Sequence, residues 1–228
     1  MLRSLHAVCR LSSFLCVLAL AAAPCMAEDK SAPQEASEEG FVALFNGKDL
    51  DGWQGAKDGY EVVDGVLISK KSSGGNIYTE KEYKDFVFRF EFKLEPGANN
   101  GVALRAPTKG DAAYVGMECQ ILDDGHKSYA NIAPYQAHGS IYGVIAAKRG
   151  ALAKTGEWNS EEITLKGRHV KVVLNGQTIV DGDLDKASTP KTIDGRDHPG
   201  LKNEKGYIGF CGHGARIEFR NLRIKELE

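Results

Sequence analysis

A carboxylate and an amide stand two residues apart in the segment 116–124, which reads Gly-Met-Glu-Cys-Gln-Ile-Leu-Asp-Asp. Residues two apart in an extended strand point to the same face, so Glu118 and Gln120 lie on one face about 7 Å apart. The apolar residues that alternate with them pack on the other face. A glutamate placed in this way is a candidate for proton transfer to or from a substrate.

An arginine approaches the same polar face from the preceding segment, 99–105, which reads Asn-Asn-Gly-Val-Ala-Leu-Arg. Alternation turns Val102 and Leu104 inward and places Arg105 on the polar face beside Glu118. There it can hold down the pKa of the carboxyl group or bind a substrate oxygen. The same spacing is also typical of a solvated sheet surface with one cross-strand ion pair, and spacing alone leaves both interpretations open.

Two histidines are flanked by glycine, where the backbone permits another molecule to come close. His138 precedes Gly139, and His213 stands between Gly212 and Gly214. Either imidazole can act as a general acid or base near neutral pH. A turn histidine without a chemical role is the alternative for each.

Two tryptophans, Trp53 and Trp158, are candidates for stacking on a sugar ring, and core packing is the alternative for both. The run Asp181-x-Asp183-x-Asp185 lacks the glycine and the final glutamate of a calcium loop. No segment matches the zinc-protease, serine-hydrolase, phosphate-loop or dinucleotide motifs. Hydride transfer, phosphoryl transfer and serine-hydrolase chemistry therefore have no support in the sequence.

Strands must position these side chains. Residues 85–94 alternate apolar and polar side chains, which predicts a strand with one buried face. The dipeptides Asp64-Gly65 and Asn175-Gly176 are typical of tight hairpin turns. Strands are expected at 41–45, 60–63, 66–69, 75–79, 85–94, 100–106, 114–122, 140–145, 158–166, 169–174, 177–180, 206–211 and 215–225.

About a dozen strands without a long helix predict an all-β fold, with two antiparallel sheets packed as a β-sandwich or jelly roll. No repeat of fixed period and no linker rich in proline and serine divides residues 40–228, which we expect to form one domain. The stretch 181–205 is irregular and charged, and we expect a long loop there. Loops of that length often carry function.

Composition narrows the function further. Of the 228 residues, 42% are hydrophobic and 26% are charged, which is typical of an ordinary folded protein. Lysine and arginine total 29 against 31 aspartates and glutamates, a formal charge of −2. This balance lacks the basic surplus of a nucleic-acid binder, so we expect no nucleic-acid partner. The sequence does not predict an oligomeric state.

The first 27 residues are typical of a secretory signal peptide. Arg3 and Arg10 precede the apolar run 11–23, and small residues at 25 and 27 prepare a cleavage site after Ala27. The apolar run is too short to span a bilayer comfortably, so we expect no transmembrane helix in the mature chain. We expect export to the periplasm or the cell exterior. Lipidation at Cys25 is the alternative, which Pro24 disfavours because a small residue is wanted there.

Residues 28–39 are acidic and polar, and we expect a flexible tether that leads into the domain. Cleavage after Ala27 leaves two of the five cysteines, Cys119 and Cys211. Alternation places Cys119 toward the core and Cys211 toward a polar surface, so two free thiols are expected, although an oxidising compartment permits a bridge.

Eight short motifs follow one another along residues 40–228. They are Leu44-Phe45-Asn46-Gly47-Lys48-Asp49-Leu50-Asp51-Gly52-Trp53, Asn100-Gly101-Val102 with Arg105, Glu118-Cys119-Gln120-Ile121-Leu122-Asp123, Gly139-Ser140-Ile141-Tyr142, Glu157-Trp158-Asn159, Leu174-Asn175-Gly176, Gly206-Tyr207-Ile208-Gly209 and Phe219-Arg220-Asn221-Leu222. Taken in this order, they resemble the 3-keto-disaccharide hydrolase domain family. The resemblance implies a jelly roll of the concanavalin A-like or laminin G-like kind.

The resemblance also implies cleavage of a glycoside whose ring carbon C3 is already a ketone. The ketone acidifies the C2 proton, so a base can remove it and the C1–O bond can break by β-elimination before water adds. Glu118 is the candidate base, and His138 or His213 would protonate the leaving oxygen. Arg105 and Gln120 would bind the ketone or enolate oxygen. Further candidates for substrate binding are Asn100, Tyr142, Trp53 and, as a reserve carboxylate, Glu91.

A divalent cation would be an alternative electrophile to Arg105. Some of the residues Glu91, Glu118 and His213 would hold it, although no ligand spacing in the sequence demands a metal.

A non-catalytic sugar-binding module of the cell envelope is the rival function, because lectins share this fold and fold alone does not decide function. Such a module would depend on Trp53 and Tyr142 rather than on Glu118. A structural envelope protein is a third hypothesis. Convergence of Glu118, Arg105 and a histidine in one cleft would favour the enzyme.

Overall fold

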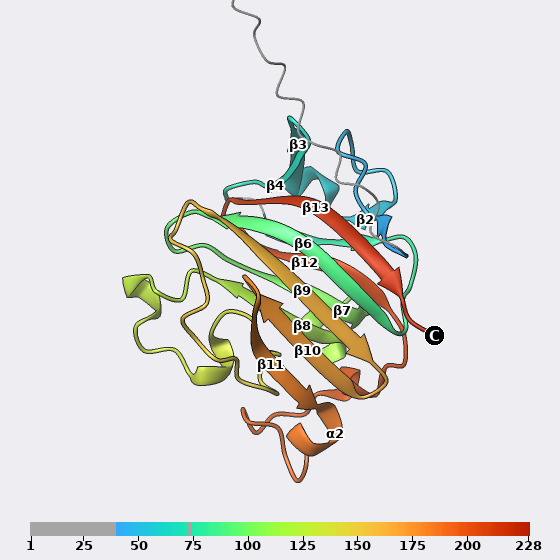
Figure 1. Ribbon diagram of the computed structural model, residues 1–228, viewed down its shortest axis with the longest axis vertical. Coiled ribbons are helices and arrows are strands. Elements are labelled where there is room, and N and C mark those ends of the chain that lie inside the picture. The colour runs from blue at the N-terminus through green and yellow to red at the C-terminus, as the bar shows by residue number, and fades with distance from the viewer. Residues whose placement is uncertain (1–39, 73) are drawn as a thin grey trace, which may run out of the picture. The chain divides into compact units, whose positions relative to one another are not determined.

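The computed structural model describes residues 40–72 and 74–228 (Figure 1). The predicted signal peptide, 1–27, and the predicted tether, 28–39, lie outside the described residues. The described chain consists mostly of strands that form two antiparallel sheets, so the predicted all-β sandwich is confirmed.

The strands are β1 (Val42–Ala43), β2 (Trp53–Gly55), β3 (Tyr60–Val63), β4 (Val66–Ser69), β5 (Gly74–Thr79), β6 (Phe86–Leu94), β7 (Asn99–Ala106), β8 (Met117–Leu122), β9 (Trp158–Lys166), β10 (His169–Leu174), β11 (Gln177–Asp183), β12 (Tyr207–His213) and β13 (Ile217–Glu226). The larger sheet has eight strands in the order β11-β10-β9-β6-β13-β4-β3, with β1 paired to β13 beside this path. The smaller sheet has five, in the order β2-β5-β12-β7-β8. Figure 1 shows β13, β6 and β9 side by side in the larger sheet.

Short helical turns lie in the connections between strands. They are α1 (Ala112–Val115), α2 (Leu184–Ala187) and the 3-10 turns η1 (Lys57–Gly59), η2 (Lys127–Tyr129), η3 (Pro134–Gln136) and η4 (Pro199–Lys202). In the part of the chain that the structure describes, no helix has the length and apolar character needed to cross a bilayer.

Aromatic side chains from both sheets meet in the space between them. The four phenylalanines of β6 all point inward, as their alternation predicts. From the smaller sheet, Phe210 stacks on Phe219 of the larger sheet, with ring centroids 4.0 Å apart. The fully buried Trp53 stacks on the Phe210 ring, with centroids 5.8 Å apart. Because each sheet buries one face in this core, its other face is available for polar side chains.

Two tight turns form as their dipeptides predict. Asp64-Gly65 joins β3 to β4, Asn175-Gly176 joins β10 to β11, and all four residues have positive φ. This is the backbone conformation of a type I′ turn. The bounds of β3, β4, β9 and β10 match the predicted ranges, because alternation and turn residues mark the same positions.

Residues 112–115 form α1 instead of the start of a strand, so the expected strand 114–122 begins three residues late. The cause is local: the carboxylate of Asp111 accepts the backbone N–H of Ala113 and caps a helical turn.

One further predicted strand needs correction, and one strand was missed. The segment 140–145 is a loop in which Ile141 makes single bridges to Cys119 and Ile145. β2 was not predicted, because three residues are too few to show alternation. The stretch 181–205, expected to be a loop, contains the end of β11 together with α2 and η4.

Cys119 and Cys211 are free thiols, as predicted. Cys119 lies in the core between the sheets, whereas Cys211 packs with Tyr78 and Ala103 on the outer face of the smaller sheet, beside Ala112 of α1. Burial is the main cause that raises the pKa of both thiols well above the usual value.

Candidate active site

Glu118 and Gln120 lie on the outer face of the smaller sheet, as alternation predicts. Their strand, β8, is an edge strand, and its neighbour β7 places Ala103 opposite Glu118 and Gly101 opposite Gln120. Glu118 and Gln120 are nearly buried, with 6% and 5% of their surface exposed. A carboxylate so far removed from water needs a compensating partner.

The Glu118 carboxylate lies directly over Gly101. A Cβ atom at position 101 would stand 1.8 Å from Oε1 of Glu118, which is far too close for two non-bonded atoms. Any other residue at this position would therefore displace the carboxylate. The outward positions Ala103 and Gly209 are also small and pair across β7 and β12. Small side chains thus leave room above this part of the sheet.

His213 meets the carboxylate from the end of β12. Its Nε2 is 4.0 Å from Oε1 of Glu118, and half of its side chain is exposed. At this separation the groups interact through charge, and a small side-chain movement would join them by a hydrogen bond. The contact with Glu118 raises the pKa of His213, burial opposes this effect, and the charge of Asp111 adds to it. The imidazole is therefore biased toward its protonated, acidic form.

Oε1 of Glu118 is buried and has no hydrogen-bond partner among the described residues. Buried polar atoms are normally paired, so an exception calls for an explanation. Here the unpaired oxygen and the imidazole of His213 present a base and an acid to the same space. That arrangement fits removal of a proton from one substrate atom and delivery of a proton to another.

The helical turn α1 covers one side of this face. Ala112 packs with Tyr78 on the sheet, and Asp111 caps the turn. Burial raises the pKa of Tyr78, and the charge of Asp111 raises the pKa values of both Tyr78 and His213. The Tyr78 hydroxyl accepts a hydrogen bond of 2.8 Å from Asn76, which leaves its own proton for another acceptor.

The loop that carries Tyr142 covers the edge of β8. Tyr142 donates its backbone N–H to the carbonyl of Glu118 at 2.9 Å, and its hydroxyl accepts a hydrogen bond from Gln136 at 3.0 Å. Gln120 donates one amide hydrogen to Asn99 at 3.0 Å. The Tyr142 hydroxyl can still donate its own hydrogen, and the Gln120 amide can donate its second one. Both side chains can therefore bind a substrate oxygen near Glu118.

Arg105 does not lie with Glu118, and its predicted placement is wrong. Its φ is +45°, at a bulge where the register between β7 and β12 shifts, and this turn takes the side chain off the polar face. The guanidinium is buried, lies 2.8 Å from the Asp85 carboxylate and donates to the carbonyls of Lys84 and Gly167. Arg105 therefore links the end of β7 to the segment that precedes β6 and to the turn that follows β9.

His138 lies between the sheets rather than on the outer face, which corrects its predicted placement. Its Nδ1 accepts the backbone N–H of Leu122 at 3.1 Å, so Nε2 carries the hydrogen that is donated to Glu161 at 2.9 Å. The ring stacks on Phe92 with centroids 5.0 Å apart. Alternation does not specify the direction of a loop residue, which is why the sequence could not separate the two histidines. Of these, His213 is the one that reaches Glu118.

Two candidates for substrate binding belong to the interior. Trp53 is fully buried and donates its indole N–H to the carbonyl of Leu44 at 2.9 Å, so core packing, the alternative interpretation, describes it. Asn100 is also fully buried, and its side-chain oxygen accepts the N–H of Gly101 at 2.8 Å. Neither side chain reaches the outer face that holds Glu118.

Glu91 lies on the outer face of the other sheet. Its carboxylate binds Arg220 and Asn221 at 2.7 Å each. Alternation predicted a polar face for Glu91 but could not say to which sheet that face belongs. The cation set of Glu91, Glu118 and His213 therefore does not come together. Within residues 40–72 and 74–228, no three His, Cys, Asp or Glu side chains form a group that could hold a metal ion.

Comparison with known proteins decides the family. Residues 40–225 match the 3-keto-alpha-glucoside-1,2-lyase-like domain. The chain belongs to this family. The resemblance carried by the eight sequence motifs is therefore confirmed, and the lyase-like domain comprises both sheets described above.

Named relatives of the lyase-like domain act on carbohydrates. The 3-keto-disaccharide hydrolase of Bacteroides thetaiotaomicron is 25% identical over 230 residues, which cover 83% of this chain and 79% of that protein. A crystal structure from Parabacteroides distasonis, provisionally assigned as a glycosyl hydrolase, is 32% identical with a TM-score of 0.73, covering 82% of this chain and 99% of that one. The lyase-like domain is a carbohydrate-active enzyme.

A more distant likeness shows the fold alone. The carbohydrate-binding module CBM66 of Bacillus subtilis is 12% identical with a TM-score of 0.50, covering 77% of this chain and 96% of that module.

Sequence reasoning missed two residues at the site of the lyase-like domain, Asp111 and Tyr78. Asp111 has the residue type of a helix N-cap, but a helix of four residues gives no periodic pattern to draw attention to it. Tyr78 lies in a predicted strand, where its outward direction was the available signal.

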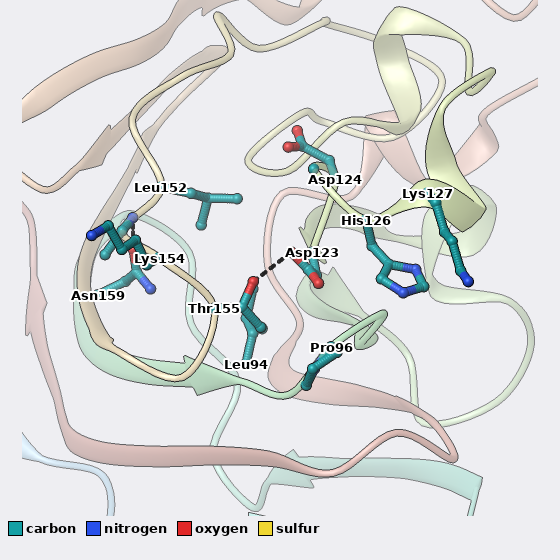
Figure 2. Close-up of a pocket in the computed structure, with 12 residues that line it drawn as sticks. Leu94, Pro96, Asp123, Asp124, His126, Lys127, Leu152, Lys154, Thr155 and Asn159 are labelled. Atoms are coloured by element: carbon teal, nitrogen blue, oxygen red, sulfur yellow. Dashed lines mark hydrogen bonds between the residues drawn. The ribbon is translucent and has the colours of Figure 1, made fainter.

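A separate cavity of about 520 Å³ opens where β6 and β8 end (Figure 2). Figure 2 shows Thr155 hydrogen-bonded to Asp123 at its centre, between the loops that carry His126 and Lys154. The Thr155 hydroxyl donates to the Asp123 carboxylate, with 3.1 Å between the two oxygens. The residues that line this cavity do not include Glu118 or His213. The candidate active site of the lyase-like domain is therefore on the outer face of the smaller sheet, where the acid and the base meet.

Proposed function

We propose that this lyase-like domain cleaves glycosides whose ring carbon C3 is a ketone, by proton abstraction and elimination. The observation that carries the proposal is the buried, unpaired Oε1 of Glu118 with Nε2 of His213 4.0 Å away. Membership of the family and the name of the 25% identical relative support the same substrate class.

In the first half of the reaction, Glu118 takes the proton from C2, and the electrons of that C–H bond form a C2=C3 bond while the C3 oxygen becomes an enolate. The enolate then reforms the ketone, a C1=C2 bond forms and the C1–O bond breaks. The leaving oxygen receives the proton of the His213 imidazolium. Gln120 and Tyr142 provide hydrogen-bond donors for the C3 oxygen.

In the second half, water adds to the unsaturated sugar. Neutral His213 takes a proton from water as the water oxygen bonds to C1, and protonated Glu118 returns its proton to C2. The sum of both halves is hydrolysis of the glycoside, and each side chain regains its starting protonation state.

Release of aglycone from a chromogenic 3-keto-glucoside, beside the unoxidised glucoside, tests this function. Glu118→Gln removes the base, so we expect kcat to fall by about 10²- to 10⁴-fold. Glu91→Gln is the matched control, because it changes a glutamate on the other sheet. Turnover of the unoxidised glucoside at the same rate, or full activity in Glu118→Gln, would contradict the proposal. Sugar binding without turnover in the wild type would favour the rival sugar-binding module.

Export is a second part of the proposal, supported by the charge, apolar run and small residues of 1–27. Mass spectrometry of the protein recovered from its native cells should find Glu28 as the first residue. A chain that retains Met1, or one that begins with a lipid-modified Cys25, would contradict cleavage after Ala27.

A further inference from the structure

An exposed arginine packs against α1, the helical turn that covers one side of the candidate active site. Arg196 stacks on the ring of Tyr114, with its Cζ 3.9 Å from the ring centroid, and it also donates a hydrogen bond to the Tyr114 hydroxyl. Tyr114 belongs to α1, the turn that covers the outer face of the smaller sheet. An exposed arginine loses rotamer entropy when it binds a ligand, and these contacts reduce that loss.

The loop that presents Arg196 is anchored by a buried contact between His198 and Asp194. His198 and Asp194 have 0% and 3% of their side-chain surface exposed, and Nε2 of His198 is 3.1 Å from the carboxylate. Nδ1 of His198 lies 3.0 Å from the carbonyl oxygen of Ala113. Asp194 also accepts the hydroxyl of Thr192 at 2.9 Å and the backbone N–H of Arg196 at 3.0 Å.

The carboxylate of Asp194 suits this buried place. Burial alone raises its pKa, but the hydrogen bonds from the Arg196 N–H, His198 and Thr192 outweigh burial, so the pKa of Asp194 lies below the ordinary value. The contact between His198 and Asp194 therefore holds the loop independently of the Arg196 side chain.

The same loop is joined to the strand of Glu118. Asp194 donates its backbone N–H to the carbonyl of Gly143 at 3.2 Å. A Cβ atom at position 143 would stand 2.5 Å from the Asp194 carboxylate and 2.8 Å from the His198 ring, so glycine is needed for this approach. The preceding residue, Tyr142, donates its N–H to the carbonyl of Glu118 at 2.9 Å.

We propose that Arg196 is a substrate-binding residue of this site, whose guanidinium binds an oxygen of the sugar that lies over Glu118. The inference rests on the proposed function of the same site. The ketone and hydroxyl oxygens of a 3-keto sugar are hydrogen-bond acceptors, and the enolate carries negative charge. Arg105, the cation expected for this role, is buried elsewhere, whereas Arg196 is exposed and its guanidinium lies over Tyr114 of α1.

The test compares Arg196→Ala with Lys191→Ala, which removes an equal charge from an exposed position in the same loop. We expect Arg196→Ala to lower kcat/KM for the 3-keto-glucoside by roughly 10- to 100-fold, as for loss of one hydrogen bond to a charged group. We expect Lys191→Ala to stay within about twofold of wild type, as for an exposed side chain without a named role. Arg196→Lys should recover part of the loss, because it restores the charge but not the planar fork. The His198–Asp194 anchor remains in all three variants, so their thermal midpoints should match the wild type.

A kcat/KM of Arg196→Ala within about twofold of wild type, or an equal loss in Lys191→Ala, would overturn the inference. If the wild type cleaves no 3-keto-glucoside, the proposed function fails, and Arg196 is then tested by calorimetric binding of the unoxidised glucoside. Weaker binding in Arg196→Ala than in Lys191→Ala would support the inference. Equal binding in the two variants, or no binding by the wild type, would overturn it.

Discussion

At the scale of single residues, position 101 controls where the Glu118 carboxylate lies. The Cβ atom of Gly101→Ala would occupy a point 1.8 Å from Oε1, so the carboxylate must rotate away or the strand must shift. We expect kcat/KM to fall by about 10²-fold, the effect of misplacing a reacting group by an ångström or so. Steady-state kinetics on the 3-keto-glucoside measure this loss.

Gly125→Ala is the control for that experiment, because no atom beyond the two neighbouring residues in the chain lies within 4 Å of a Cβ at position 125. It should keep full activity. If Gly101→Ala also keeps full activity, the carboxylate position described for Glu118 does not matter for turnover.

The pH dependence of His213 is a second residue-scale prediction. Its contact with Glu118 raises its pKa above the ordinary 6.5. The reaction needs the imidazolium as an acid, so activity should be retained through pH 6.5 and fall as the pH rises through the raised pKa. In an NMR titration of the ring, the His213 midpoint should move to lower pH in Glu118→Gln. An unchanged midpoint would show that the carboxylate does not act on this ring.

The same shift has a consequence for stability with a definite sign. A histidine whose pKa is higher in the folded state contributes stability below its unfolded pKa of about 6.5. This contribution is lost as the pH rises through the folded pKa of His213. The free energy of unfolding of the wild type should therefore fall relative to that of His213→Gln over this interval.

At the scale of elements, Arg105 illustrates how a bulge redirects a side chain. Arg105→Met leaves the Asp85 carboxylate with the N–H of Gly167 and without its buried cation. Breaking a buried ion pair on one side costs roughly 3–5 kcal/mol of unfolding free energy. Urea unfolding should show this loss, while kcat/KM per folded molecule stays near the wild-type value. A loss of kcat with an unchanged free energy of unfolding would instead indicate that Arg105 takes part in the reaction.

Regular elements were predictable, and their irregular neighbours were not. Alternation in β6 and the Asn175-Gly176 turn are local properties, so the sequence predicted both. The direction of Arg105 depends on a φ of +45°, and the four-residue helix α1 depends on one cap at Asp111. Neither feature leaves a periodic pattern in the sequence.

At the scale of the whole molecule, the aromatic core joins the two sheets. Phe210 stacks on Phe219 of the larger sheet at 4.0 Å and on Trp53 at 5.8 Å. Phe210→Ala should cost about 3–5 kcal/mol of unfolding free energy in urea, because it opens a cavity between the sheets. Val63→Ala, at an exposed position, should cost less than about 0.5 kcal/mol. Equal losses in the two variants would contradict this account of the core.

Which polar residues share a surface is also a property of the whole molecule. Glu91 and Glu118 both alternate with buried residues, and the sequence treats them alike. The sheet order places one on each outer face of the sandwich, so pairing of distant strands decides which glutamate meets His213. The motifs singled out Glu118 and Gln120, whereas the long-range fold selected His213 over His138 and excluded Glu91.

The reactivity of the two buried thiols can report local opening of the fold. A thiol reacts with an alkylating reagent as the thiolate, so protected, high-pKa cysteines are modified only when the structure opens. Cys119 requires separation of the two sheets, whereas Cys211 lies beneath α1 on the outer face. Timed alkylation followed by peptide mass analysis would therefore give a separate modification rate for each cysteine. If Cys211 is alkylated faster than Cys119, the difference measures how often α1 separates from the smaller sheet while the two sheets remain packed together.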